Sequence, residues 1–342
     1  MSEIRQDKLT DRWVICAPER AHRPHEHKRE SRQTGHPPQK GAGCPFCPGN
    51  EHMLESIVAE TSPEWSDSWQ TRVVENKYPV VGPAPAVEGG IHGIYFAAPG
   101  YGVHEVIVEH PHHNRQLGSM SRRDMEVICR TYRDSYRRVM QADEKIASVT
   151  IFRNHGPAAG TSLVHPHSQL VATGIVPNRV AVRETVSERY YRLNERCVLC
   201  DVLKYEREHG QRIVYESDKC LAFVPFAARV PFEIIIAPKT HNADFADAED
   251  SLLADLAASL LTVLKGLRGA AEDPDYNYIF QTFSRQRKKS AHLHWYLQIT
   301  PRMTIPAGFE IGSGIGVNAS LPETDAESLR CELEKMRAEQ PA

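Results

Sequence analysis

The chain has 342 residues, of which 41% are hydrophobic and 25% charged, and its formal net charge is −3. This composition is typical of a globular protein with one large domain or two ordinary ones, and the lack of a basic excess argues against nucleic acid as a partner. The start MSEIRQDKLTDRW is too polar for a signal peptide, and no apolar run reaches membrane-spanning length. We therefore expect a cytoplasmic protein that does not bind a membrane.

Residues 22–43 are rich in proline, glycine and charge and are predicted to form a loop. The loop leads into Cys44 and Cys47 of GCPFCPG, a C-x-x-C motif that recurs as Cys197 and Cys200 in RCVLCD. In a cytosolic chain such pairs favour metal ligands over disulfides. A thioredoxin-like redox pair is the alternative, which the intervening Pro-Phe and Val-Leu do not favour. The motifs predict metal sites, provided that histidines complete each set.

The elements that follow each motif occur in the same order in both halves. In the first half, HEVIVEHPHH predicts a strand from Glu105 to His113, and in the second half FEIIIAPKTH predicts one from Glu233 to His241. The separation between the glutamate and the last histidine is the same in both. The pattern therefore indicates an internal duplication.

Each half then continues with a helix, a strand and an H-x-H motif. The helical patterns cover 121–140 and 248–269, and the strand patterns cover 147–156 and 276–284. We expect an α+β fold with two similar halves, each a mostly antiparallel sheet with helices packed on it. The halves, 1–178 and 195–342, would meet around residues 178–195.

The first H-x-H motif lies in GTSLVHPHSQLVATG. Pro166 favours extended backbone at His165, and side chains two residues apart in a strand share one face. His165, His167 and Gln169 are therefore predicted to line one surface, where two imidazoles and an amide are typical of a functional site. A solvated strand with incidental histidines is the alternative.

Two cysteines and two histidines in each half are the ligand set of a closed tetrahedral zinc site. In the first half, Cys44 and Cys47 would be joined by one histidine of the H-x-H motif and by His113. His110 and His112 compete with His113, but only His113 matches the position of His241. Because a closed site has no open position for water, we interpret the zinc as structural. The other histidine of each H-x-H motif is then not needed as a zinc ligand and is available for another role.

The segments GCPFCPGNE, FRNHGPAAGTSLVHPHSQ and PFEIIIAPKTH resemble the galactose-1-phosphate uridylyltransferase family, a duplicated branch of the histidine triad superfamily. DRWVICAPERAHRP and GFEIGSG extend the resemblance over nearly the whole chain. The resemblance implies ping-pong transfer of a nucleoside monophosphate through a covalent nucleotidyl-histidine. It makes His167 the nucleophile, His165 a zinc ligand and Gln169 the amide that holds the phosphoryl group. It further implies substrate contacts by Arg20, Arg23, Asn76, Asn154, Gly160, Ser162, Phe309 and Glu310.

The resemblance also implies two zinc ions per chain. The second would be held by Cys197, Cys200, His241 and His294, whereas the repeat alone would pair His165 with His292. The chain departs from the family at three places: Ser168 replaces a glycine, Thr304 lies where a sugar-phosphate lysine is expected, and iron-site histidines are replaced by Gln298 and Thr300. The second cysteine and histidine set is similar to the branch that includes plant ADP-glucose phosphorylase.

Three functions follow as hypotheses. The leading one is an enzyme of galactose metabolism that exchanges UMP between a UDP-hexose and a hexose 1-phosphate, a nucleotide sugar and a sugar 1-phosphate being its partners. The second is a phosphorylase of ADP-glucose or a dinucleotide, with adenylyl transfer to inorganic phosphate. The third is a non-catalytic, zinc-stabilised nucleotide-binding protein, although His167 and Gln169 are both present. The resemblance further implies a homodimer.

Overall fold

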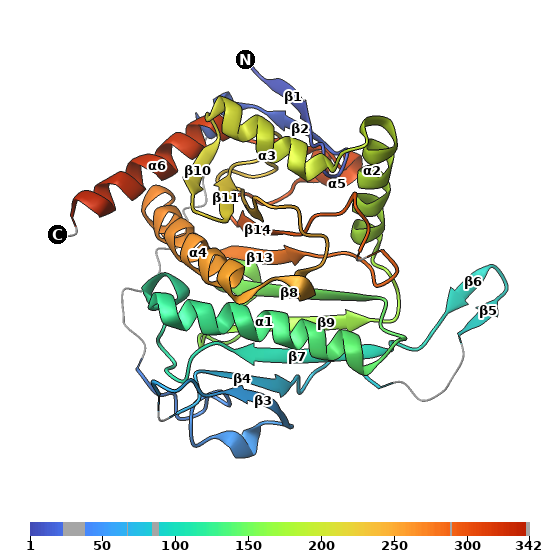
Figure 1. The fold of residues 1–342 in the computed structure, drawn as a ribbon, viewed down its shortest axis with the longest axis vertical. Coiled ribbons are helices and arrows are strands. Elements are labelled where there is room, and N and C mark those ends of the chain that lie inside the picture. Colours follow the sequence, from blue (N-terminus) through green and yellow to red (C-terminus); the bar gives the residue numbers. More distant parts are fainter. Residues whose placement is uncertain (23–37, 67, 84–88, 288, 340–342) are drawn as a thin grey trace.

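The computed structural model describes residues 1–22, 38–66, 68–83, 89–287 and 289–339. Its main feature is one antiparallel sheet (Figure 1). The strands of this sheet are β3 (Ile57–Thr61), β4 (Thr71–Glu75), β7 (Gly102–Val108), β8 (Ser148–His155), β9 (His167–Thr173), β10 (Ile213–Glu216), β11 (Cys220–Phe223), β12 (Ile234–Pro238), β13 (Tyr276–Gln281) and β14 (Tyr296–Pro301). The predicted α+β class is confirmed.

The strand order shows the duplication directly. It is β10-β11-β12-β14-β13-β8-β9-β7-β4-β3, so five strands of the second half are followed by five of the first in mirrored order. The halves join where β8 pairs antiparallel with β13, with Asn154 opposite Asn277. The predicted halves therefore share one continuous sheet.

Helices α1 (Arg122–Ala142) and α4 (Asp250–Ala270) cover one face of this sheet (Figure 1). Helix α1 begins at Ser121, whose side chain accepts a hydrogen bond from Asp124 N in a capping box. Its apolar side chains recur every three or four residues, so they form one stripe that packs on the sheet. Helix α6 (Pro322–Ala338) packs on α4, where a Cβ on Gly266 would lie 3.1 Å from Leu333.

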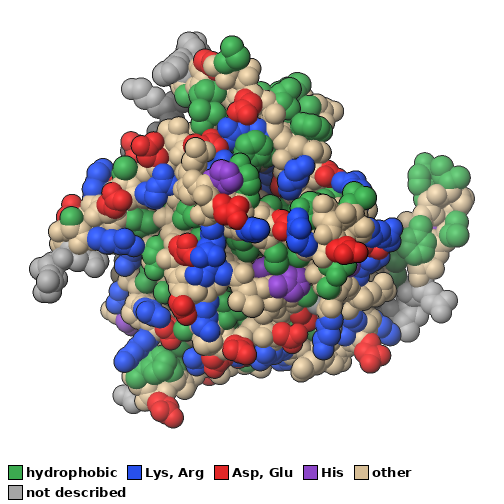
Figure 2. Space-filling view, turned by 45° about the horizontal axis from the view of Figure 1, so that its top comes forward, with side chains coloured by type: hydrophobic (Ala, Val, Ile, Leu, Met, Phe, Trp, Pro, Cys, Tyr) green, Lys and Arg blue, Asp and Glu red, His purple; other side chains and the backbone are tan. Residues whose placement is uncertain are grey.

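The remaining elements lie around the sheet. Strands β1 (Glu3–Gln6), β2 (Trp13–Cys16) and β15 (Gly316–Asn318) form a small sheet, next to helices α2 (Asn178–Asn194), α3 (Val198–His209) and α5 (Gly308–Ser313). Strands β5 (Gly90–His92) and β6 (Tyr95–Ala97) form a projecting hairpin whose surface is largely hydrophobic (Figure 2). In the described ranges, no helix combines the length and apolar character that a membrane crossing requires.

Several boundaries differ from those predicted. Strand β7 ends at Val108, before the proline that was placed inside it, and β12 ends at Pro238. Pro238 has no N–H to donate to the ladder and is the last residue of β12, whereas β7 ends three residues before its proline. The region around 178–195, where the halves were expected to meet, contains helix α2. Most of the predicted loop 22–43 lies outside the described residues.

Candidate functional site

The first cysteine and histidine cluster joins the loop at 41–50 to the start of β9. The ligand atoms of Cys44, Cys47, His113 and His165 all lie within 4.8 Å of one another. His165 Nδ1 is 3.7 Å from Cys44 Sγ and 3.6 Å from Cys47 Sγ. Ligands around a tetrahedral zinc, at bonds of about 2.0–2.3 Å, lie roughly 3.5 Å apart. The donor types and their spacing fit such an ion.

The surrounding residues orient these ligands. Asn50 donates to the carbonyl oxygen of Cys44 at 2.8 Å, which closes the C-x-x-C turn. His165 Nε2 lies 2.7 Å from the carbonyl oxygen of His110, so this nitrogen donates and Nδ1 is left as the ligand atom. Among the three competing histidines, it is His113 whose ring enters the cluster, with Nδ1 3.6 Å from Cys47 Sγ.

The second cluster has the same composition and lies at the N-terminus of α3. It contains Cys197, Cys200, His241 and His294, again with ligand atoms within 4.8 Å of one another. Cys200 Sγ is 3.4 Å from His241 Nδ1 and 3.5 Å from His294 Nδ1. His292 is not part of the cluster, so the geometry agrees with the family resemblance rather than with the simple repeat. These donors also fit a zinc ion.

His167 begins β9, two residues after the cluster ligand His165. Its Nδ1 lies 2.8 Å from the carbonyl oxygen of His165, which can only accept, so Nδ1 carries the proton and Nε2 keeps its lone pair. The side chain is 8% exposed, and its ring lies 5.4 Å from that of Phe46. Burial lowers the pKa of His167 to about 4. The arrangement presents a neutral imidazole with one available nitrogen.

Gln169 lies on the same face of β9, and its amide is oriented by His104. The backbone N–H of Val80 donates to His104 Nδ1 at 3.1 Å, so His104 Nε2 carries the proton. Nε2 donates to Gln169 Oε1 at 2.9 Å, whereas Asn76 Nδ2, 3.0 Å from the same nitrogen, is itself a donor and makes no hydrogen bond to the protonated Nε2. Because Oε1 is occupied, the Gln169 NH₂ is left to donate to a ligand. His104 was not identified from the sequence.

Asn154 and Gly160 lie together at the end of β8. Asn277 donates to Asn154 Oδ1 at 2.7 Å, and a Cβ on Gly160 would be 3.8 Å from Asn154 Nδ2. The amides of residues 158–161 are already bonded within the molecule, Ala158 N to Asp275 Oδ2 at 2.6 Å and the others to nearby carbonyl oxygens. Backbone contacts to a phosphate would therefore come from Ser162 onwards, and Ser162 is exposed.

A buried polar network lies beneath strand β9. Glu109 forms an ion pair with Arg153, and Arg153 Nη1 donates to the carbonyl oxygen of His167 at 3.3 Å. The Tyr132 hydroxyl lies 2.7 Å from Ser168 Oγ and 2.6 Å from the Tyr278 hydroxyl, which comes from β13 of the other half. This network connects helix α1, strand β9 and the second half, and no sequence motif indicated it.

The other predicted substrate residues have no described contact with His167 or Gln169. Arg20 is exposed in the short helix Pro18–His22, and Arg23 lies outside the described residues. Phe309 and Glu310 are in α5, where Glu310 accepts a bond from Ala307 N at 3.1 Å. In the described part of the chain, no hydrogen bond connects these two residues to His167 or Gln169.

The strand register corrects the predicted alignment of the two halves. Val106 and Phe152 flank Gln169, and Ile235 and Ile279 flank Gln298 in the same way. Glu233, two residues before Ile235, is therefore equivalent to His104 and not to Glu105.

Side-chain contacts agree with this register. Gln298 donates to Glu233 at 2.5 Å on the site face, whereas Glu105 pairs with Arg138 of α1 on the opposite face. The equal spacing to the histidines was misleading, because the intervening turns differ in length. A slip of one residue reverses the face of every side chain in a strand.

Fold and site together define a duplicated histidine-triad nucleotidyltransferase, and comparisons with known proteins agree. Residues 1–177 match the model of the galactose-1-phosphate uridyl transferase N-terminal domain, and residues 206–299 match the HIT domain. The chain belongs to the galactose-1-phosphate uridylyltransferase family, as the sequence motifs had indicated.

Relatives of two activities resemble the chain over most of its length. It is 33% identical to ADP-glucose phosphorylase of Arabidopsis thaliana, covering 96% of this chain and 92% of that protein. It is 28% identical to galactose-1-phosphate uridylyltransferase of Thermotoga maritima, covering 96% and 98%. The crystal structure of the Arabidopsis phosphorylase with bound ADP-glucose superposes with a TM-score of 0.83 at 30% identity, covering 96% and 98% of the two chains. A uridylyltransferase structure has a TM-score of 0.75 at 27% identity, covering 98% and 99%.

Proposed function

We propose that the chain transfers a nucleoside monophosphate from a nucleotide sugar to a phosphate acceptor, with His167 as the nucleophile. The observation that carries the proposal is the bond of His167 Nδ1 to the carbonyl oxygen of His165, which directs the Nε2 lone pair away from the backbone. A closed cysteine and histidine cluster fixes the residue two positions earlier. The nucleophile is thereby oriented before substrate binds.

The reaction has two displacements at one phosphorus. His167 Nε2 attacks the α-phosphorus of the nucleotide sugar, the N–P bond forms, and the P–O bond to the sugar 1-phosphate breaks. An oxygen of the acceptor phosphate then attacks the same phosphorus, and the N–P bond breaks with return of the electron pair to Nε2. Gln169 would donate its amide hydrogens to a phosphoryl oxygen in both steps, without adding charge.

Zinc is the metal that both clusters suit, with two ions per chain. Two thiolates and two imidazoles close each site, so the ion would supply structural support rather than an open coordination position. In the first cluster, this support would fix the backbone of His165 and hence the start of β9. The second cluster would fix α3 and the strand that begins at Tyr296.

The remaining substrate contacts are proposals of the same kind. Asn76, Asn154, Gly160 and Ser162 would contact the nucleotide phosphates and ribose, which is supported by the contact of Asn76 with His104 and by the closeness of Gly160 to Asn154. Arg20, in the short helix Pro18–His22, and Phe309 and Glu310, in α5, would complete the substrate contacts. A homodimer is supported by the β5–β6 hairpin, on which Ile94 is 90% exposed.

The uridylyl hypothesis has UDP-hexose as donor and a hexose 1-phosphate as acceptor. It is supported by the match of residues 1–177 to the uridyl transferase domain and by relatives with that activity. The side chains on the site face, an amide and two imidazoles, do not themselves distinguish uracil from adenine.

The second candidate is adenylyl transfer from ADP-glucose to inorganic phosphate. It is supported by the 33% identity to the plant phosphorylase and by the second cluster of two cysteines and two histidines. Thr304 also favours it, because a threonine brings no charge for the phosphate of a second sugar.

The test is to incubate the protein with UDP-glucose or ADP-glucose, labelled at the α-phosphate, without an acceptor. We expect an acid-labile phosphoramidate on His167 from one of the two donors. Discharge by galactose 1-phosphate would support the uridylyltransferase, and discharge by inorganic phosphate the phosphorylase. Initial-rate plots should be parallel. Intersecting plots without a trapped adduct would contradict the role of His167.

A further inference from the structure

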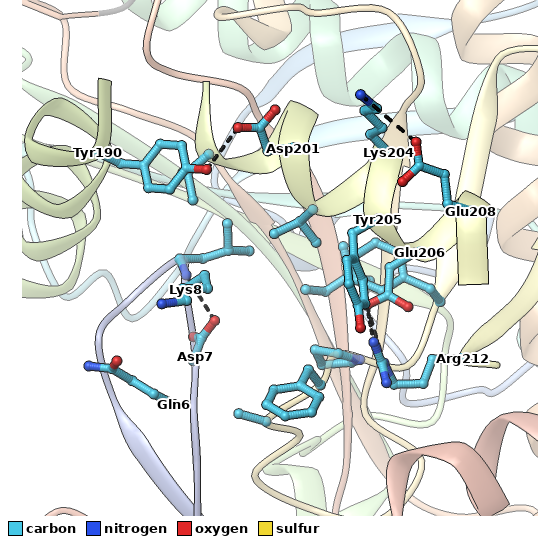
Figure 3. A pocket seen from close by; sticks show the side chains of 18 of the residues that line it. Gln6, Asp7, Lys8, Tyr190, Asp201, Lys204, Tyr205, Glu206, Glu208 and Arg212 are labelled. Carbon is cyan, nitrogen blue, oxygen red and sulfur yellow. Dashed lines mark hydrogen bonds and ion pairs between the residues drawn. The ribbon is translucent and has the colours of Figure 1, made fainter. Parts of the chain in front are cut away.

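Two adjoining cavities lie on the outer face of the second half, on the side of the sheet away from α4. The larger has a volume of about 480 Å³ and lies between α3, the β1–β2 segment and strands β11 and β12 (Figure 3). The smaller, of about 60 Å³, lies over β13 and β14. Both are lined by Asp7, Leu9, Pro225, Ala227 and Ile235, so they have a common wall.

Four arginines line the smaller cavity. Arg179 and Arg183 come from the first turns of α2, Arg12 precedes β2, and Arg229 precedes β12. The carboxylates of the lining belong to Asp7 and Glu233, which leaves a formal excess of two positive charges.

Both carboxylates are already engaged with neighbouring donors. Asp7 accepts from Thr10 Oγ1 and Leu9 N, and Glu233 accepts from Arg229 N and Gln298. Glu233 also pairs with Arg229 at 3.5 Å, so Asp7 is the remaining carboxylate of the lining for the other three arginines, and the positive charge is only partly compensated.

Arg183 is the most informative of the four. Its side chain is 8% exposed, and although Nη2 donates to the carbonyl oxygen of Thr282 at 3.2 Å, the buried Nε has no hydrogen-bond partner among the described residues. Burial lowers its pKa, and burial followed by repulsion from neighbouring arginines lowers the pKa of Arg12 and Arg179. A buried guanidinium N–H without an acceptor is costly, and an anion in the cavity would remove that cost.

The larger cavity is apolar in its floor and neutral at its rim. Leu9, Phe223, Phe226 and Ile235 contribute apolar surface. Several charged groups of the lining are paired with one another: the buried Arg212 with Glu206 at 2.9 Å and Lys204 with Glu208 at 3.8 Å, while Tyr190 donates to Asp201 at 2.7 Å (Figure 3). A volume of about 480 Å³ lies within the range of ligand sites.

We propose that these cavities form a second binding site, for a nucleoside phosphate whose phosphoryl group lies among the four arginines and whose base lies in the apolar cavity. The site is on the sheet face that corresponds, by the register of the repeat, to the face of His167. Tyr296 takes the place of His167 there, so the site has no nucleophile and binds without turnover. The proposal is independent of the donor and acceptor assigned to the catalytic half.

The experiment counts bound nucleotide in the full chain by equilibrium dialysis with labelled ADP and, separately, UDP. The variant Arg12→Gln/Arg179→Gln removes two guanidinium groups for which the structure shows no hydrogen bond. Arg192→Gln is the matched control, since Arg192 is on the same helix, outside the cavity, and pairs with Glu188. We expect the double variant to bind one equivalent fewer than the wild type and the control. The same equivalent should persist in His167→Ala.

If the wild type, the double variant and the control bind the same number of nucleotides per chain, the proposal is wrong. A cavity that is filled by a partner subunit would give this same equal stoichiometry and would also overturn the proposal. Ribose 5-phosphate and inorganic phosphate provide the second measurement. Both should displace the arginine-dependent equivalent, with affinity at least about tenfold weaker than that of ADP or UDP. If inorganic phosphate binds as tightly as the nucleotides, the assignment of the apolar cavity to a base is wrong.

Discussion

The two halves of the molecule place different side chains on the same framework. On the outer face of the sheet, His167, Gln169, His104 and Asn154 of the first half correspond to Tyr296, Gln298, Glu233 and Gln281 of the second. The amide at one position is kept, while the imidazole before it becomes a phenol. Under the proposed mechanism the chemistry would be confined to the first half, although both halves keep a cysteine and histidine cluster.

The difference continues on the inner face, under α1 and α4. Glu109, Arg153 and Ser168 of the first half correspond to Pro238, Phe280 and Leu297, which are buried among apolar side chains. Buried ion pairs are rarely the most stable solution, and the second half shows that this fold can do without one. We infer that the first half keeps its polar network because it holds the backbone of His167.

The largest effect is expected from His167→Ala. Removal of the imidazole proposed as the nucleophile should lower nucleotidyl transfer on the order of a thousandfold or more, and no phosphoramidate should form. The control is His209→Ala, at an exposed histidine at the end of α3. If His167→Ala turns over at a rate close to that of the wild type, the proposal that the first half carries the nucleophile is wrong.

Arg153→Met tests the polar network against its apolar counterpart. Loss of the guanidinium leaves Glu109 buried and unpaired, so the free energy of unfolding should fall by about 3–5 kcal/mol. Phe280→Met, at the equivalent position, should cost less than about 1.5 kcal/mol because it exchanges one apolar side chain for another. Urea denaturation measures both. Equal losses in the two variants would show that the network has no special energetic role.

The two clusters should respond differently to loss of a thiolate. Cys44→Ser and Cys197→Ser should each lose about one zinc per chain in metal analysis. Turnover should fall roughly a hundredfold in Cys44→Ser, because His165 then no longer fixes the strand of His167, and less in Cys197→Ser. Full zinc occupancy in either variant, or a larger kinetic effect of Cys197→Ser, would contradict the assignment.

The smallest effect is expected from His104→Ala. Without the donor to Oε1, the Gln169 amide can rotate, so kcat should fall about tenfold with little change in KM. His104→Gln, which can donate from the same place, should recover part of the loss. A change confined to KM would instead make His104 a binding residue. The result bears on the difference between the halves, because Glu233, at the position equivalent to His104, accepts a hydrogen bond from Gln298 instead of donating one.

The sequence predicted those parts of the site that depend on spacing. The C-x-x-C and H-x-H motifs are local, so the four ligands of each cluster could be assembled from the repeat and the family resemblance. His104 and Arg153 belong to no motif, because their roles depend on partners in other strands. The partner of His104 is Gln169, 65 residues later in the chain. Arg153 donates to the backbone of His167 on the neighbouring strand. Such contacts are set by sheet pairing, which sequence patterns do not show.

For the fold too, features that depend on local sequence signals were predicted and features that lack such signals or depend on long-range pairing were not. The helices at 121–140 and 248–269 were predicted closely, since their apolar periodicity and the Ser121 cap are local signals. Helix α2 was missed because it has almost no one-sided apolar pattern, its partly polar buried residues including Arg183 and Glu184. The alignment of Glu105 with Glu233 was wrong because it was based on the spacing to the following histidine. That spacing depends on the length of the turn and does not report the register of the strand.

The pairing of β8 with β13 has a consequence for how the chain is made. Strand β8 ends about 120 residues before β13 begins, so during synthesis the edge of the first half has no partner. At ordinary elongation rates this interval lasts roughly ten seconds, long enough for an unprotected edge to pair with another chain. The nascent first half would also lack the Tyr278 hydroxyl that completes its buried network. A gene cut between the halves would therefore deliver an aggregation-prone fragment instead of a small working enzyme.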